Sequence, residues 1–198
     1  MLSFFYKYLY ILLFITILIC IFFIPFFEID NSSFSQYTNN NFVFSSYNFV
    51  WPIPGYTNIS SPFGKRSSPT SGASTYHSGI DIPAPEGTKL YAIDNGTVTF
   101  ASWGAGGGYT ITYQLDNYPD IKISYCHVSP IILVSLRESI HKGQVIGSVG
   151  PKNVYGIINN PYKDSNGNPT NGASTGCHLH FTIKYNNTAV NPLNYYDL

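Results

Sequence analysis

Glycine, proline, asparagine and aspartate recur from Trp51 to the end of the chain, at intervals of roughly ten residues. This spacing excludes a long amphipathic helix, because glycine and proline interrupt helices and the apolar residues between them have no helical period. Short segments of β-branched and aromatic residues between turn-forming residues are typical of strands. The sequence therefore predicts an all-β domain over residues 51–198.

Six segments of this domain fit a strand best, namely residues 88–93, 96–103, 109–115, 121–127, 144–149 and 178–185. The glycine-rich run GAGGG at residues 104–108 predicts a hairpin turn. It is not a phosphate-binding loop, because no helix follows it. Residues 151–176 predict a long loop, which in compact domains usually serves function. The DSNGNP run in this loop does not match a calcium site, because Thr175 stands where the bidentate glutamate should be.

The N-terminus has a different character. Residues 8–27 contain no charged side chain, and a helix of about twenty residues spans a hydrocarbon core about 30 Å thick. Lys7 precedes this segment, and Glu28 and Asp30 follow it. Because the positive flank stays in the cytoplasm, the sequence predicts one transmembrane helix within residues 1–28 and an exported domain behind it.

We expect this helix to remain as an uncleaved signal anchor, so that the protein is a single-pass protein of the cell membrane with its domain on the cell-wall side. A cleaved signal peptide would need a small-residue site, which is absent before Ser32. A lipoprotein signal would need small residues before Cys20, where Leu18 and Ile19 stand. Residues 29–50 are polar and aromatic, without helical periodicity, and predict a spacer.

The charge composition narrows the range of partners. Ten basic and ten acidic residues give a formal net charge of zero, and charged residues make up only 10% of the chain. A protein of this kind lacks the basic field that attracts nucleic acid. We therefore expect no nucleic-acid partner and a monomeric protein that contacts the membrane through its N-terminal helix.

Two clusters combine residues that can bind a metal. His178 and His180 alternate within the predicted strand 178–185, which places both side chains on one face about 6.6 Å apart. The run HSGID combines His77 with Asp81, and Asp81 stands between two isoleucines, where an unpaired charge is costly. Either cluster alone is common on protein surfaces, but together they indicate a metal site.

His127 completes the set of chemically active residues. It ends the predicted strand 121–127, where alternation places it on the same face as Tyr125. Catalytic zinc sites take three protein ligands and keep one position for water. His77, Asp81 and one histidine of the HLH pair supply such a set. The other histidine of the pair and His127 are then left for acid–base or charge-stabilising work.

Three motifs, HSGID, YCHVS and CHLHF, occur in the order found in the lysostaphin-type zinc metallopeptidases of cell-wall hydrolases, and SSPFGKR also fits that family. The chain resembles this family over residues 51–196. The resemblance implies that His77, Asp81 and His180 bind Zn²⁺, and that His127 and His178 are the catalytic histidines. It also implies a compact antiparallel β-sandwich or open barrel with an active-site groove.

The activity that the resemblance implies is hydrolysis of peptide bonds in the stem peptides or cross-bridges of peptidoglycan. Some relatives have lost ligands and act as regulators, so a non-hydrolytic wall-binding or activator module is one alternative. A wall-opening component of a phage or conjugation apparatus is another. All five motif positions are retained in this chain, which favours an enzyme.

The cysteines form no CxxC pair. If the two catalytic histidines face a groove from neighbouring strands, Cys126 and Cys177 share the opposite face, where a disulfide can persist in an exported protein. We favour two free thiols, because cysteine also packs as a small apolar residue. The fifth histidine, His141, lies beside a lysine and a turn glycine and is interpreted as a surface residue.

Overall fold

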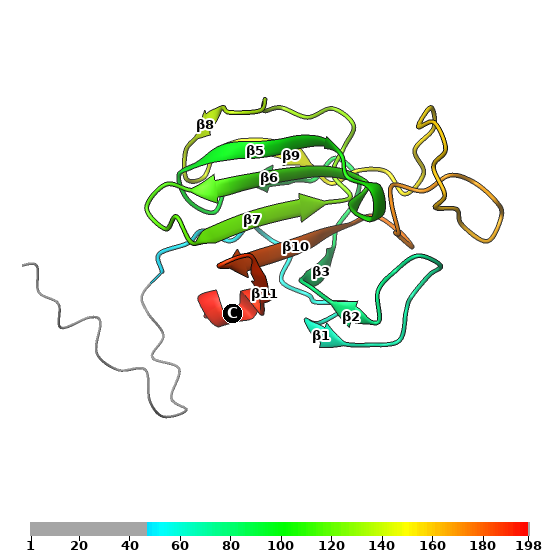
Figure 1. Cartoon of the computed structure of the whole chain (residues 1–198), viewed down its shortest axis with the longest axis horizontal. Helices are drawn as coiled ribbons and strands as arrows, with labels where there is room; N and C mark the ends of the chain where they lie inside the picture. Colours follow the sequence, from blue (N-terminus) through cyan, green and yellow to red (C-terminus); the bar gives the residue numbers. More distant parts are fainter. Residues whose placement is uncertain (1–46, 198) are drawn as a thin grey trace, which may run out of the picture. The chain divides into compact units, whose positions relative to one another are not determined.

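The computed structural model describes residues 47–197 as a β-domain built on one large sheet (Figure 1). The strand order of this sheet is β11-β10-β7-β6-β5-β8. β3 pairs with the start of β10, on the edge that faces away from β7. All of these neighbours are antiparallel. The strands are β3 (Ile80–Pro83), β5 (Gly96–Trp103), β6 (Tyr109–Leu115), β7 (Ile121–Cys126), β8 (Ser139–Ile140), β10 (His178–Tyr185) and β11 (Thr188–Val190).

Two small sheets and two short 3-10 helices complete the described part of the chain. They are β1 (Gly64–Lys65) paired with β2 (Tyr76–His77), β4 (Lys89–Tyr91) paired with β9 (Val145–Ser148), η2 (Ala105–Gly107) and η3 (Pro192–Tyr195). The prediction of an all-β, antiparallel domain is confirmed.

The hydrophobic core lies between the large sheet and the small sheet of β4 and β9. Alternate residues of the long strands face this core and are buried, including Ile111, Ile123, Tyr125 and Phe181. The two layers touch closely at Gly147 of β9, where an added Cβ would lie 3.0 Å from the Cδ1 atom of Ile111. A sandwich of this kind needs small residues at such contacts.

A chain of hydrogen bonds crosses the core between the layers. The Ile93 N–H donates to the Tyr113 hydroxyl at 2.9 Å, and the Tyr113 and Tyr125 hydroxyls are 3.2 Å apart. The Tyr125 hydroxyl donates in turn to the Tyr91 carbonyl at 2.7 Å. Both tyrosine side chains are fully buried. These hydrogen bonds give partners to the Ile93 N–H and the Tyr91 carbonyl, two backbone groups in or near β4.

Most predicted strands match the observed ones. Residues 96–103, 109–115 and 178–185 are strands as predicted, and η2 makes the glycine turn between β5 and β6. β4 and β9 are shorter than the predicted 88–93 and 144–149. The ends of these segments instead make single backbone bonds, such as the Val149 N–H to the Thr88 carbonyl at 2.8 Å.

The domain begins earlier than the sequence analysis assigned it. Phe49 is buried in the core, and the Val50 N–H donates to the Ile93 carbonyl at 3.0 Å. Residues 47–50 therefore belong to the domain and not to the spacer. The predicted transmembrane helix within residues 1–28, and the rest of the spacer, lie outside the described residues. Across residues 47–197, no helix is long and apolar enough to cross a membrane.

We predict that Tyr125→Phe lowers the free energy of unfolding by about 1–3 kcal/mol, because it leaves the partly buried Tyr91 carbonyl without its donor. Urea unfolding of the full-length protein, followed by circular dichroism, measures this change. Tyr185→Phe is the matched control, because Tyr185 is 39% exposed at the end of β10. Equal unfolding midpoints for the two variants would contradict the prediction.

Candidate metal and catalytic site

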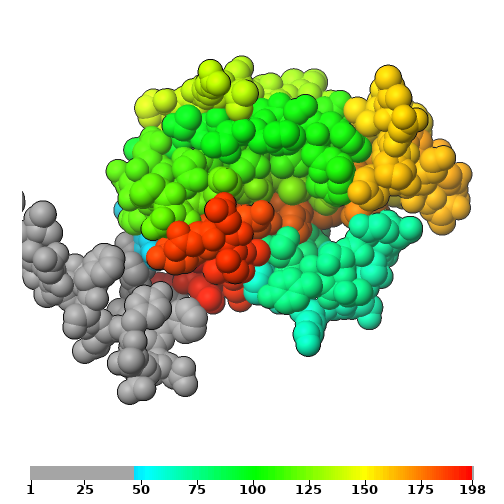
Figure 2. Space-filling view, in the orientation of Figure 1, coloured from blue at the N-terminus to red at the C-terminus, as the bar shows by residue number. Residues whose placement is uncertain are grey.

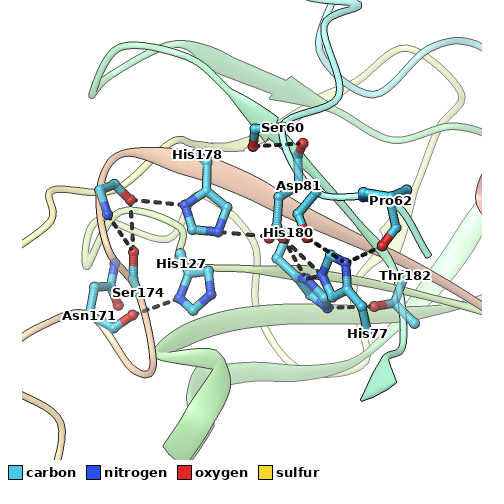
Figure 3. Close-up of polar contacts among 12 residues, drawn as sticks. Ser60, Pro62, His77, Asp81, His127, Asn171, Ser174, His178, His180 and Thr182 are labelled. Carbon is cyan, nitrogen blue, oxygen red and sulfur yellow. Dashed lines mark hydrogen bonds and ion pairs between the residues drawn. The ribbon is translucent and has the colours of Figure 1, made fainter. Parts of the chain in front are cut away.

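Strand β10 carries His178 and His180 between β3 and β7. In the paired register, His180 lies opposite Asp81 on β3 and opposite Cys126 on β7. Leu179 and Phe181 face the core with no exposed surface, so the two histidines project from the other face of the sheet. Asp81 projects to that same side (Figure 3).

Three donor atoms meet at one point on this face. The Nε2 atom of His77 lies 3.1 Å from Oδ1 of Asp81 and 2.9 Å from Nδ1 of His180. Nδ1 of His180 lies 2.8 Å from Oδ1 of Asp81. His77 arrives from β2, and it is 1% exposed. The structure thus brings together the three residues that the sequence analysis predicted as metal ligands.

The tautomers of the two histidines fit a cation at this point. Nδ1 of His77 is 2.8 Å from the Pro62 carbonyl oxygen, which can only accept a hydrogen bond, so Nδ1 carries the proton and Nε2 carries a lone pair. Nε2 of His180 is 3.0 Å from the Thr182 hydroxyl, and donation to that hydroxyl leaves a lone pair on Nδ1. Three converging lone pairs repel one another unless a cation lies between them.

The donor set suits zinc. Two imidazole nitrogens and one carboxylate oxygen form a common set of three ligands in catalytic zinc sites. Zinc–ligand bonds of about 2.0–2.1 Å place tetrahedral donors about 3.3 Å apart, close to the spacing observed here. Backbone and hydroxyl partners on the distal ring nitrogens are also typical of metal-binding histidines. The residues present therefore fit a zinc ion.

The carboxylate of Asp81 is held in its charged form. Burial raises its pKa, but the imidazoles of His178, His180 and His77 around it outweigh burial and hold the pKa well below its ordinary value. The other carboxylate oxygen, Oδ2, lies 3.1 Å from Nη1 of Arg66. No role was predicted for Arg66 from the sequence, although its run SSPFGKR fits the family.

The backbone conformation that brings His127 to the site differs from the strand predicted for it. β7 ends at Cys126, and His127 has a left-handed backbone with φ of 58°. The prediction that His127 shares a face with Tyr125 is wrong: Tyr125 is buried in the core, whereas the His127 ring lies 4.7 Å from the ring of His178. The left-handed residue turns the side chain across the sheet to the histidine face.

Both remaining histidines present the same atom to the site. Nδ1 of His127 donates to the Asn171 carbonyl at 2.6 Å, and Nδ1 of His178 donates to the Gly176 carbonyl at 2.9 Å. Each ring therefore keeps a lone pair on Nε2, and Nε2 of His178 lies 3.5 Å from Oδ1 of Asp81. Burial, then the neighbouring His178 and His180, lower the pKa of His127 to about 3. A neutral His127 can accept a proton at neutral pH.

Asn171 fixes the end of the long loop that orients His127. Its side chain is fully buried. Its amide donates to the Val128 carbonyl at 3.0 Å and its oxygen accepts from the Tyr109 N–H at 2.9 Å. Gly108 makes this approach possible, because an added Cβ would lie 2.2 Å from the Asn171 oxygen. Asn171 was not predicted from the sequence, since one asparagine in a loop rich in asparagine carries no local signal.

A groove runs over these residues. The segment from Ser60 to Pro69 lines one side, and residues 173–177 of the long loop line another. Figure 2 shows these two parts of the surface on either side of the start of β10. His141 is exposed and lies outside the residues that line the groove, as predicted.

The proposed shared face of the two cysteines is not present. Cys126 lies opposite His180 and so on the histidine face, whereas Cys177 precedes β10 and lines the groove. Both are free thiols, as we favoured. Burial raises the pKa of Cys126 to about 11, so that this thiol is protonated at neutral pH. The third cysteine, Cys20, lies outside the described residues.

A protein-family model described as peptidase family M23 matches residues 75–162. The chain belongs to peptidase family M23. The match includes the HSGID and YCHVS motifs and ends within the long loop. The predicted kinship with lysostaphin-type metallopeptidases is confirmed by the likeness to lysostaphin from Staphylococcus simulans. That structure has a TM-score of 0.54 and 25% identity over 71% of this chain and 50% of lysostaphin.

This M23 chain is also similar to a curated bacterial protein and to another solved structure. The DD-carboxypeptidase/endopeptidase Mpg of Neisseria meningitidis serogroup B is 33% identical over 138 residues, which are 70% of this chain and 27% of Mpg. The chain thus spans about a quarter of the length of the first curated relatives that it matches. A zinc containing peptidase from Vibrio cholerae has a TM-score of 0.57 at 24% identity, over 77% and 41% of the two chains, and shows the shared fold.

We predict that Asn171→Ala lowers the free energy of unfolding by about 2–4 kcal/mol, because it leaves the buried Val128 carbonyl and the partly buried Tyr109 N–H unpaired. Thermal unfolding of the full-length protein measures the loss. The control is Asn166→Ala in the same loop, at an exposed residue whose backbone N–H alone bonds to Asp164. A loss no larger than that of the control would show that Asn171 does not fix the loop.

Proposed function

We propose that the protein is a zinc-dependent endopeptidase that hydrolyses peptide bonds in peptidoglycan stem peptides or cross-bridges. His77, Asp81 and His180 are the zinc ligands, and His127 and His178 handle protons. Membership of family M23 and the relatives' activities support this proposal. The Mpg protein is described as a DD-carboxypeptidase/endopeptidase, and ShyC of Vibrio cholerae as a peptidoglycan DD-endopeptidase.

One observation carries the proposal. Three metal-binding atoms converge within 3.1 Å, and two further imidazoles stand beside them with their Nδ1 atoms tied to backbone carbonyls. A wall-binding module has no need for two such oriented imidazoles next to a metal site. The arrangement suits hydrolysis, and it favours an enzyme over a non-hydrolytic module.

When bound, a zinc ion supplies Lewis-acid activation of the attacking water and of the peptide carbonyl. Nε2 of His127 or His178 can accept the proton of the attacking water and pass it to the leaving amine. The second imidazole can hydrogen-bond the oxygen on which negative charge grows. The Asn171 and Gly176 carbonyls keep both rings in the tautomer that this work requires.

We predict that wild-type protein binds one zinc ion and that Asp81→Ala loses metal and hydrolysis together. His127→Ala and His178→Ala should keep zinc but lose turnover by about a hundredfold to ten-thousandfold, because they contact the reacting atoms and not the metal. Metal analysis and mass spectrometry of fragments released from purified peptidoglycan test this. His141→Ala is the matched control and should retain full activity.

Two results would count against this assignment. Full zinc occupancy in Asp81→Ala would remove Asp81 from the ligand set. A wild-type protein that binds peptidoglycan and releases no fragments would favour the wall-binding alternative.

We also propose that residues 1–28 anchor the enzyme in the cell membrane, with the domain on the cell-wall side. The uncharged segment 8–27 and its flanking charges support this orientation. Protease added to cells stripped of their wall should remove the domain and leave a small membrane-bound fragment. A mature protein that starts near Ser32 in the medium would mean that the segment is a cleaved signal peptide.

A further inference from the structure

The segment from Ser60 to Arg66 wraps around Asp81. The Asp81 N–H donates to the Ser61 carbonyl at 3.0 Å, and the Ser60 N–H donates to the Asp81 carbonyl at 3.0 Å. The side chains add a second set of contacts. Nη1 of Arg66 donates to Oδ2 of Asp81 at 3.1 Å and to the Ser61 hydroxyl at 2.5 Å. Ser61 and Arg66 together hold both the backbone and the carboxylate of Asp81.

The same pair reaches a second residue of the metal site. The Ser61 hydroxyl is 3.3 Å from Nδ1 of His77, the ring nitrogen that points away from the site. The hairpin of β1 and β2 sets this arrangement, because Gly64 lies opposite His77 in its register. The Arg66 N–H donates to the Thr75 carbonyl at 2.9 Å and extends the hairpin. One hairpin therefore supplies both His77, a predicted metal ligand, and Arg66, which contacts Asp81.

The two carboxylate oxygens of Asp81 have different partners. Oδ1 alone faces His77 and His180, whereas Oδ2 faces the guanidinium. A carboxylate without such a partner can rotate and offer both oxygens to a metal. Arg66 prevents this rotation, because a turn of the carboxylate would break its ion pair. Outer contacts of this kind orient metal ligands in proteins.

The placement of Arg66 favours this role over a purely stabilising one. Its side chain is only 19% exposed and lines the groove. Within the described residues, its Nε atom is buried without a hydrogen-bond partner, which costs free energy. A surface arginine chosen for stability would keep that N–H in water. The unpaired Nε–H of Arg66 is thus a cost that accompanies the contact of its guanidinium with Asp81.

We propose that Arg66 is a positioning residue that, with Ser61, makes Asp81 bind the metal through Oδ1 alone. The proposal rests on the proposed function only in requiring that His77, Asp81 and His180 hold zinc. It concerns a residue that touches no metal, and its effect is measured as metal affinity and coordination geometry.

The first experiment measures zinc affinity by competition with a chelator, on full-length protein. Arg66→Ala should weaken zinc binding about 10–100-fold. Arg66→Lys should recover part of this loss, because a single ammonium keeps the charge but lacks the planar fork. Lys65→Ala is the matched control: it removes a charge of the same sign from the neighbouring exposed position and should bind zinc like wild type.

The second experiment replaces zinc with Co²⁺ and records the visible absorption spectrum. If the carboxylate in Arg66→Ala offers both oxygens, the ion gains a ligand and its visible absorption weakens relative to wild type and Lys65→Ala. A merely structural role of Arg66 would not change the spectrum of the folded, loaded fraction. Arg66→Gln, which keeps two N–H donors without the charge, provides the same comparison if Arg66→Ala does not fold.

The outcomes separate the two proposals. Zinc affinity and Co²⁺ spectra of the folded Arg66 variants that match wild type would overturn the positioning role. A wild-type protein that binds no zinc would overturn the proposed function instead. Weaker binding in Arg66→Ala with partial recovery in Arg66→Lys supports the positioning role.

Discussion

Hydrogen bonding along both edges of β10 is the constraint on which the rest of the structure depends. β7 pairs with six residues of one edge, and β3 pairs with the first four residues of the other. This register sets Asp81 opposite His180, although the two residues are 99 positions apart in the chain. It also places Cys126, the residue before His127, on the opposite side of His180. A slip of one residue in the pairing of β3 with β10 would turn Asp81 toward the core while the histidines stayed on the other face.

The period of two in these strands keeps the hydrophobic core and the polar site on opposite faces of one sheet. Phe181 packs against Trp51 and Tyr125 on the core side, directly behind the histidines. Rotamers of the site residues are thus supported by a packed layer and by hydrogen bonds to loops. Preorganisation of this kind lowers the cost of arranging donors during a reaction.

The sequence was informative where the chemistry is encoded locally. The alternation of His178 and His180, and the charge of Asp81 between two isoleucines, depend on neighbouring residues alone. His127 was found as a residue but placed on the wrong face. Its left-handed backbone is set by bonds to distant segments, the Gly107 carbonyl at 2.7 Å and the Gly150 N–H at 2.9 Å. The roles of Asn171 and Arg66 likewise depend on pairings that no single segment encodes.

The long loop is tied near its base: the Asn171 N–H donates to the Lys152 carbonyl at 2.9 Å, and the Ala173 N–H donates to the Gly106 carbonyl at 2.8 Å. Farther out, Tyr155 and Ile158 are 69% and 89% exposed, and residues 155–159 are not among the residues that line the groove. Exposed loop tips of this kind tolerate inserted sequence. For protein engineers, residues 155–159 are therefore a grafting position, where a binding module can be inserted into the chain while the rings of His127 and His178 keep their bonds to backbone carbonyls.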